Sequence, residues 1–132
     1  MKKDIPVQKV TDVIVAIVPR EEEDEFWDVY LINNKEFPIL SVIINSTGYG
    51  EIEGEKVKTS TMRYFYDEVP ARHAVKIEPI LKNLFSITNE FWVSFSLGNY
   101  LYDKKYIFVE GSLNEINFTG VPIVGKQGVM IK

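Results

Sequence analysis

The sequence predicts an all-β fold: an antiparallel β-sandwich, jelly-roll or immunoglobulin-like, with at most one short helix. Three observations predict it. The 132 residues include 8 Phe, 7 Tyr and 2 Trp, and aromatic and β-branched side chains favour strands. The apolar runs are short, and turn residues interrupt them about every 8–15 residues, as in a sandwich. The length fits one domain, and no linker divides the chain.

Strands are expected where apolar residues run together or alternate with polar ones. In chain order they span residues 10–18, 26–33, 39–45, 55–66, 74–77, 91–97, 106–111 and 113–118, followed by a terminal hairpin over 121–131. Segment 55–66 is mostly polar, which is typical of a sheet edge or of a strand with one exposed face. The domain is expected to cover residues 10–132, with residues 1–9 as a polar N-terminal tail.

The segments between the strands are expected to be loops, with one exception. Residues 20–25 contain five acidic side chains, too many charges to bury, so they predict a solvated loop. Residues 46–50 contain two glycines and are interpreted as a loop or bulge. Residues 79–85 are expected to form the single short helix, because Pro79 suits a first helical turn and the apolar spacing is helical.

The core is predicted from the alternation of apolar side chains, which is clearest over residues 91–97. The residues expected to be buried together are Phe91, Val93, Phe95, Leu97, Val15, Leu31, Ile44 and Ile107.

Composition excludes several kinds of chemistry. Without cysteine the chain has no disulfide, thiolate nucleophile or Cys-based zinc site, and His73 is the only histidine. We therefore expect no metal and no cofactor. The net charge of −4 and pI of about 5.1 disfavour binding to a phosphate backbone, so nucleic acid is not an expected partner.

The N-terminal region does not resemble a targeting sequence. Asp4 and Pro6 interrupt it, and the first apolar run, residues 13–18, is shorter than the apolar part of a signal peptide or a membrane span. We expect a cytoplasmic protein that does not partner a membrane.

One group of residues combines rings with positive charges and is interpreted as a candidate binding surface: Arg63, Tyr64, Tyr66, Arg72, His73, Tyr100 and Tyr102. Such a combination occurs on single-stranded nucleic-acid platforms and on protein interfaces. The same rings also suit ordinary cross-strand pairs within a sheet.

The leading hypothesis is a non-catalytic domain that acts through self-association or by binding a protein. Two apolar edge candidates, residues 62–66 and 129–131, predict at least a homodimer. One alternative is a module for a small molecule or carbohydrate, with Trp27 or Trp92 as the stacking platform. Another is a hydrolase-type enzyme that uses Arg72, His73 and a carboxylate, Asp67 or Glu68; we expect no catalysis there.

Overall fold

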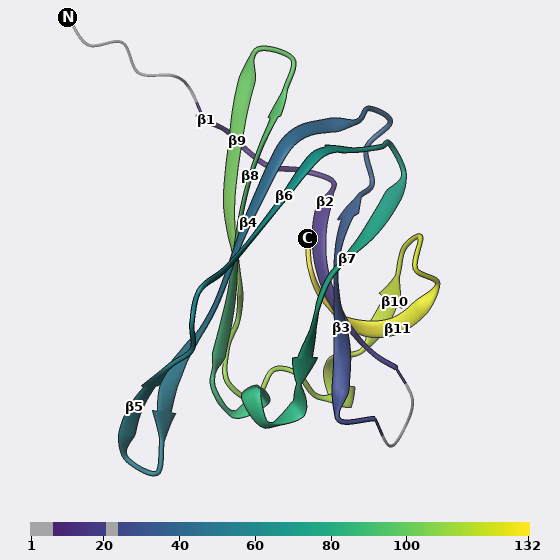
Figure 1. The fold of residues 1–132 in the computed structure, drawn as a ribbon. Coiled ribbons are helices and arrows are strands. Elements are labelled where there is room, and N and C mark those ends of the chain that lie inside the picture. The colour runs from purple at the N-terminus through teal and green to yellow at the C-terminus, as the bar shows by residue number, and fades with distance from the viewer. Residues whose placement is uncertain (1–6, 21–23) are drawn as a thin grey trace, which may run out of the picture.

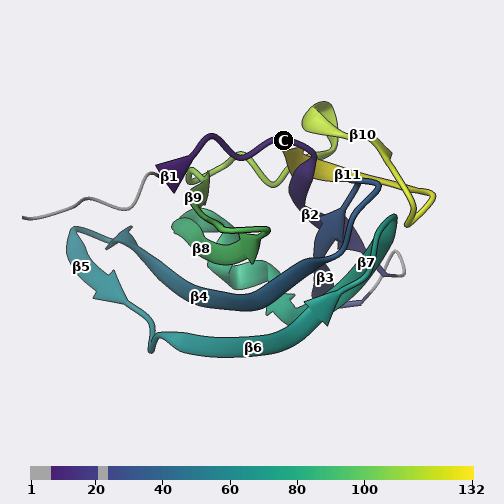
Figure 2. The ribbon, with the colours of Figure 1, turned by 90° about the horizontal axis from the view of Figure 1, so that it is seen from above.

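The computed structural model describes residues 7–20 and 24–132, in which two sheets pack against each other as a β-sandwich (Figure 1, Figure 2). The predicted all-β sandwich is confirmed. The first sheet has the order β1 (Val7–Gln8), β9 (Tyr100–Phe108), β8 (Thr88–Leu97) and β4 (Ile39–Ile52). β5 (Glu55–Lys58) and β6 (Met62–Val69) follow one another along the far edge of β4, each paired with a different part of it. The second has the order β10 (Thr119–Val121), β11 (Lys126–Ile131), β2 (Val13–Pro19), β3 (Phe26–Asn33) and β7 (His73–Leu81).

The chain crosses repeatedly between the sheets. Hairpins connect β2 to β3, β8 to β9 and β10 to β11, whereas the β3–β4, β6–β7 and β7–β8 connections lead from one sheet to the other. Every strand pair is antiparallel except β1 with β9. The first sheet therefore begins at Val7, within the segment expected to be a tail.

The main core lies between the sheets and follows the alternation of the strands. On β8, Phe91, Val93 and Phe95 point inward and are almost fully buried, as predicted. A smaller apolar cluster covers the outer face of the second sheet around Ile14 and Ile32. Because β2 is buried on both faces, its sequence is a continuous apolar run rather than an alternating one.

Two residues predicted to be buried in the core are more exposed than expected. Ile107 is 41% exposed because Tyr106 and Phe108, its neighbours on β9, are the residues that point inward. All three side chains are apolar, so the pattern did not fix which face is buried. Leu97, at the end of β8, is only partly buried against the core.

Some element boundaries also differ from the prediction. The segment expected to be a helix, 79–85, starts as the end of β7, and only Lys82–Ser86 is helical, as the 3₁₀ turn η1. Ile80 faces Trp27 across the β3–β7 ladder and packs in the core, so strand pairing overrides the helical spacing. A second 3₁₀ turn, η2 (Glu115–Asn117), replaces the strand expected over 113–118.

In the middle of the chain, a predicted loop is part of a strand, and a predicted strand is interrupted by a loop. Residues 46–50 belong to β4, and the long strand expected over 55–66 is divided into β5 and β6. The predicted acidic loop falls partly outside the described residues, since 21–23 are not among them. The terminal hairpin is confirmed as β10 and β11.

Two buried polar side chains connect distant segments. The Asn33 side chain donates to the carbonyl oxygens of Phe37, Val69 and Pro70 at 2.8, 3.2 and 3.1 Å, and its Oδ1 accepts from the Lys35 N–H at 3.0 Å. Tyr106 of the first sheet donates its hydroxyl to the carbonyl oxygen of Val13 in the second at 2.6 Å.

Candidate functional site

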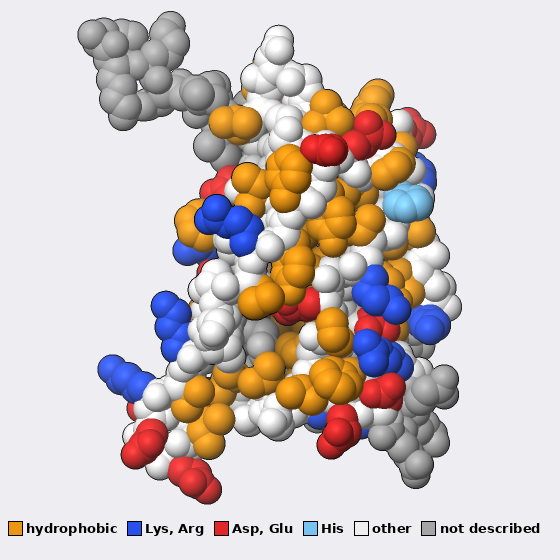
Figure 3. Space-filling model, viewed as in Figure 1, with side chains coloured by type: hydrophobic (Ala, Val, Ile, Leu, Met, Phe, Trp, Pro, Cys, Tyr) orange, Lys and Arg blue, Asp and Glu red, His pale blue; other side chains and the backbone are white. Residues whose placement is uncertain are grey.

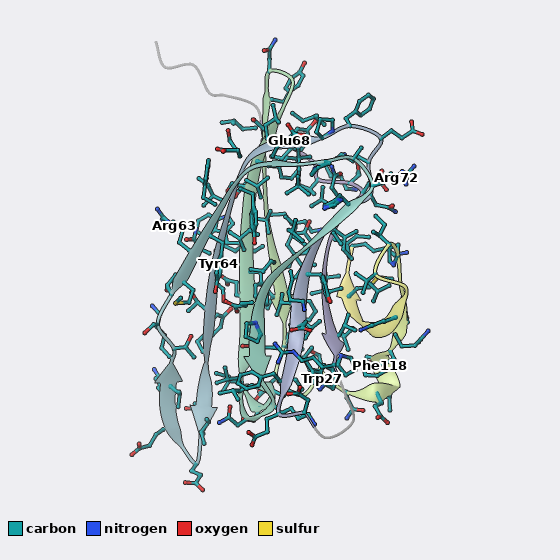
Figure 4. The ribbon with its side chains drawn as sticks, turned by 45° about the vertical axis from the view of Figure 1, so that its right-hand side comes forward. Trp27, Arg63, Tyr64, Glu68, Arg72 and Phe118 are labelled. Atoms are coloured by element: carbon teal, nitrogen blue, oxygen red, sulfur yellow. The ribbon has the colours of Figure 1, made fainter. Side chains whose placement is uncertain are left out.

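The seven residues of the predicted binding surface fall on three parts of the molecule. Arg63 lies on the outer face of the first sheet, where its Nε donates to Oδ1 of Asn45 at 3.0 Å. Tyr64 and Tyr66 alternate with it along β6 and pack against the core instead. Figure 4 shows Arg63 pointing away from the second sheet, with Arg72 at the β6–β7 turn.

The other members gather at the end of the sandwich that holds the β6–β7 turn. Arg72 donates to the carbonyl oxygen and Oδ1 of Asn34 at 2.8 and 2.9 Å, and its guanidinium lies 3.8 Å from Glu36. Tyr102 stacks on Phe95 with ring centroids 4.9 Å apart. His73 and Tyr100 are exposed. Because Arg72 is occupied in holding the turn, the geometry adds nothing to the enzyme hypothesis for the Arg72–His73 segment.

An edge strand of each sheet borders the same side of the sandwich, which we call the open side. β6 is the outermost strand of the first sheet there, and β7 is the outermost strand of the second (Figure 1, Figure 2). Among the described residues, β6 pairs only with β4 and β7 only with β3. Each strand therefore keeps one row of N–H and C=O groups without a strand partner.

Hydrophobic side chains gather on this open side, in a column that runs between the two edge strands (Figure 3). Tyr64, Tyr66 and Val75 are partly buried against the core. Met62 and Phe65 of β6 are 51% and 58% exposed. The edge of β6 thus combines unpaired backbone with large apolar side chains, the properties of an edge that pairs with another chain.

The two edge strands differ in their protection against such pairing. β7 carries Lys76, Pro79, an inward-facing carboxylate at Glu78 and a β-bulge, since its register with β3 shifts by one residue between Val29 and Tyr30. All four are devices that prevent edge-to-edge association. β6 has eight residues, no proline, no lysine and no register shift against β4. It is therefore the less protected edge.

The bulge in β7 also creates a polar contact between the sheets. The extra residue is Ile77, and the shift turns both Ile77 and the following Glu78 toward the first sheet. There Ser46 donates to Oε2 of Glu78 at 2.8 Å, and Tyr64 donates to Oε1. Burial, and then the adjacent Glu78 carboxylate, raise the pKa of Tyr64 above its usual value, so its hydroxyl stays protonated.

The two tryptophans occupy opposite environments. Trp27 is buried, with Phe85 and Phe118 packed edge-on at 4.7 and 5.5 Å between ring centroids; Figure 4 shows it beside Phe118. Trp92 is 39% exposed on the outer face of the first sheet. Of the two proposed stacking platforms, only Trp92 is accessible.

A shallow depression, here called the outer hollow, lies beside Trp92. Its volume is about 420 Å³. The small side chains of Ser41, Ser94 and Ser96 leave the space open among larger neighbours such as Leu101. Asp103 lines it and accepts hydrogen bonds from the Trp92 indole and from Ser94. The Lys105 ammonium lies 4.6 Å from the Trp92 ring centroid, so part of the stacking surface is already used.

Two further observations concern ligands and membranes. Within residues 7–20 and 24–132, no three His, Asp or Glu side chains are grouped closely enough to bind a metal ion. In the same part of the chain, no helix has the length and apolar character that a membrane crossing requires.

Sequence reasoning missed Glu78, which no motif marks. Only the bulge beside it turns the carboxylate inward, and a bulge depends on the pairing of β3 with β7 rather than on a local pattern.

Comparison of the chain with protein-family models, curated proteins and solved structures finds no match.

Proposed function

We propose that the chain is a self-associating module in which two copies pair through β6. The observation that carries this proposal is the less protected β6 edge: eight residues, Met62–Val69, with one backbone row free of a strand partner and with the exposed side chains of Met62 and Phe65. Pairing two such edges continues the first sheet from one copy into the other. It also covers apolar surface that a monomer leaves in water.

The side chains of β6 suit pairing with themselves. Two identical edges related by a twofold axis run antiparallel, and each residue then faces a fixed partner position. With the axis at Phe65, this residue faces Phe65 of the second copy, and Arg63 faces Asp67 of the second copy. Because the contact is symmetric, the Arg–Asp pair forms twice. Directly opposite aromatic and opposite-charge pairs are the ones that stabilise antiparallel sheets.

Charge reversal tests both the association and its register. We expect light scattering to give twice the 15.2 kDa chain mass for the wild-type protein. Arg63→Asp and Asp67→Arg should each dissociate the dimer, because like charges then face each other twice. The double variant should restore it. Lys56→Asp on β5 is the matched control, with the same charge change on another edge strand, and should remain dimeric.

The proposal fails if the wild-type mass stays at 15.2 kDa across a tenfold dilution series at micromolar concentration. A double variant that stays monomeric while each single variant is folded would refute the Arg63–Asp67 register.

The exposure of Trp92 supports a second candidate function, the binding of a small molecule or carbohydrate at the outer hollow. The hollow offers serine hydroxyls and the Asp103 carboxylate, and the Trp92 ring lies next to it, with its indole hydrogen-bonded to Asp103. These are the groups that hold a sugar's hydroxyls and its apolar face. A panel of soluble oligosaccharides, titrated against tryptophan fluorescence, should then change the emission of the wild-type protein but not of Trp92→Ala. No response to any member of the panel would refute carbohydrate binding.

A further inference from the structure

A cavity of about 210 Å³ opens between the sheets on the open side, and we call it the Glu78 cleft. Its polar lining comes from Ser46 of β4, Thr59 and Ser60 of the β5–β6 connection, Glu78 of β7 and Asn89 of β8. Segments that are distant in the sequence thus place polar side chains around one space. Among the described residues that line the cavity, only Glu78 carries a charge.

The remainder of the lining is apolar. Met62, Pro79, Ile80 and Leu84 surround the cavity, and Ile80 belongs to the main core. The cleft therefore has an aliphatic wall and, within the same small volume, a carboxylate. A ligand that fits it carries a short hydrocarbon part and a group that complements a negative charge.

The negative charge of Glu78 has no cationic partner in the described part of the chain. Its two hydrogen-bond donors, Ser46 and Tyr64, are both neutral, and no described Lys or Arg lies within 4.0 Å of its oxygens. Asp28 on the outer face of the same sheet is different, because Arg20 and Lys76 lie 2.9 and 3.4 Å from it. Half-buried in the cleft, the uncompensated carboxylate attracts a cation more strongly than it would in water.

We propose that the Glu78 cleft binds an alkylammonium group, with the ammonium on the Glu78 carboxylate and the alkyl chain against Met62, Ile80 and Leu84. An ammonium fits better than a guanidinium. Both carboxylate oxygens already accept a hydrogen bond, whereas the planar fork of a guanidinium requires both oxygens at once. The compact ammonium uses whichever lone pairs remain.

The bulge at Ile77 supports a site rather than an incidental gap. Without it, Glu78 would follow the strand alternation and point to the outer face, beside Lys76. Bulges that redirect a single side chain are frequent next to functional sites. Here the redirected side chain supplies the negative charge of the cleft.

Two sources supply this ligand chemistry: a free alkylamine, or the lysine side chain of an extended peptide lying on the open side. The ammonium site is separate from the charge pair of the proposed dimer, since Glu78 faces the space between the sheets whereas Arg63 lies on the outer face of the first sheet; Met62 borders both. The experiment distinguishes the sources by comparing n-butylammonium with a capped Val-Lys-Val tripeptide.

Ligand titration followed by amide chemical shifts tests the proposal. In the wild-type protein, n-butylammonium should cause saturable shifts at Ser46, Thr59, Ile80 and Asn89. The neutral n-butanol should bind at least about tenfold more weakly, because it lacks the charge that Glu78 attracts. A tripeptide that binds more tightly than n-butylammonium identifies a lysine side chain as the natural ligand, and equal affinities identify a free amine.

Two substitutions complete the test. Glu78→Gln should abolish the preference for n-butylammonium over n-butanol, while Glu68→Gln, with the same charge change on β6 outside the cleft lining, should keep it. Tyr64→Phe frees one oxygen of Glu78 and should tighten n-butylammonium binding, which provides a readout even if Glu78→Gln does not fold. Equal affinities of the wild-type protein for n-butylammonium and n-butanol, or a preference that persists in Glu78→Gln, would overturn the proposal.

Discussion

The buried side chain of Asn33 offers a sharp test of the packing at the end of the sandwich. It is 0% exposed, and its amide donates to three carbonyl oxygens while Oδ1 accepts from the Lys35 N–H. Asn33→Ala removes all four hydrogen bonds. A net loss of about 1 kcal/mol for each, reduced where water reaches the freed groups, gives a destabilisation of about 2–4 kcal/mol.

The contrast with Asn33→Asp gives this prediction its direction. Aspartate keeps the acceptor for Lys35 but turns an ionised oxygen toward the carbonyls of Phe37, Val69 and Pro70, which are acceptors too. A buried charge without a donor costs more than a small cavity, so Asn33→Asp should be less stable than Asn33→Ala at pH 7.

The pH dependence of the same pair follows from proton linkage. The environment raises the pKa of the new carboxyl in the folded state above its unfolded value of about 3.9. Its penalty is therefore present at pH 7 and disappears as the pH falls below the unfolded pKa, where the protonated acid donates a hydrogen bond. Urea unfolding of both variants between pH 7 and 4 measures the difference. If Asn33→Asp is as stable as Asn33→Ala at pH 7, or more stable, the hydrogen-bond assignment is wrong.

Two further predictions concern the core. Phe95→Ala should cost about 3–5 kcal/mol in urea unfolding, because Phe95 is 2% exposed and stacked on Tyr102; a loss below about 1 kcal/mol would contradict the packing of β8. Burial raises the pKa of Tyr106 in the folded state above its unfolded value of about 10. The Tyr106 hydroxyl therefore makes its full contribution to the stability of the fold below about pH 10, and this contribution is lost as the pH rises further. Tyr106→Phe should therefore be less stable than the wild type at pH 7, and it should lose less stability than the wild type between pH 9 and 11. Equal losses of stability in the two proteins would show that Tyr106 does not cause the pH dependence.

The sequence predicts the fold class because the patterns that define it are local. On β8, Phe91, Val93 and Phe95 alternate with residues that face outward, and this alternation alone identifies a half-buried strand. The polar character of residues 55–66 likewise predicts an edge, and β6 is the outermost strand of its sheet.

The failures arise where tertiary pairing decides between two local solutions. Ile80 and Leu84 have helical spacing, but Ile80 pairs with Trp27 on β3 and becomes a strand residue. Gly48 suggests a loop by itself, yet it lies in β4 close to the side chains of Ile87 and Thr59, where a Cβ would meet atoms at 3.1 Å. Its missing side chain allows this close approach rather than a turn.

The candidate sites depend even more on pairing. The seven residues of the predicted surface come from two stretches of the sequence, 63–73 and 100–102. Alternation along β6 sends Arg63 to one face of the sheet and Tyr64 to the other. Conversely, Ser46 and Glu78 are 32 positions apart and meet only because the sheets pack against each other.

Dimerisation through β6 and amine binding at Glu78 use opposite faces of β6, so substitutions should affect one property without the other. Arg63 and Phe65 face the outer side of the first sheet, whereas the neighbouring Tyr64 reaches inward to Glu78. Reversing the charge at Arg63 should therefore change the mass of the protein but leave n-butylammonium binding intact. Glu78→Gln should change amine binding and leave the mass intact. If either substitution alters both properties, β6 acts as a single unit, and association and ligand binding are coupled rather than independent.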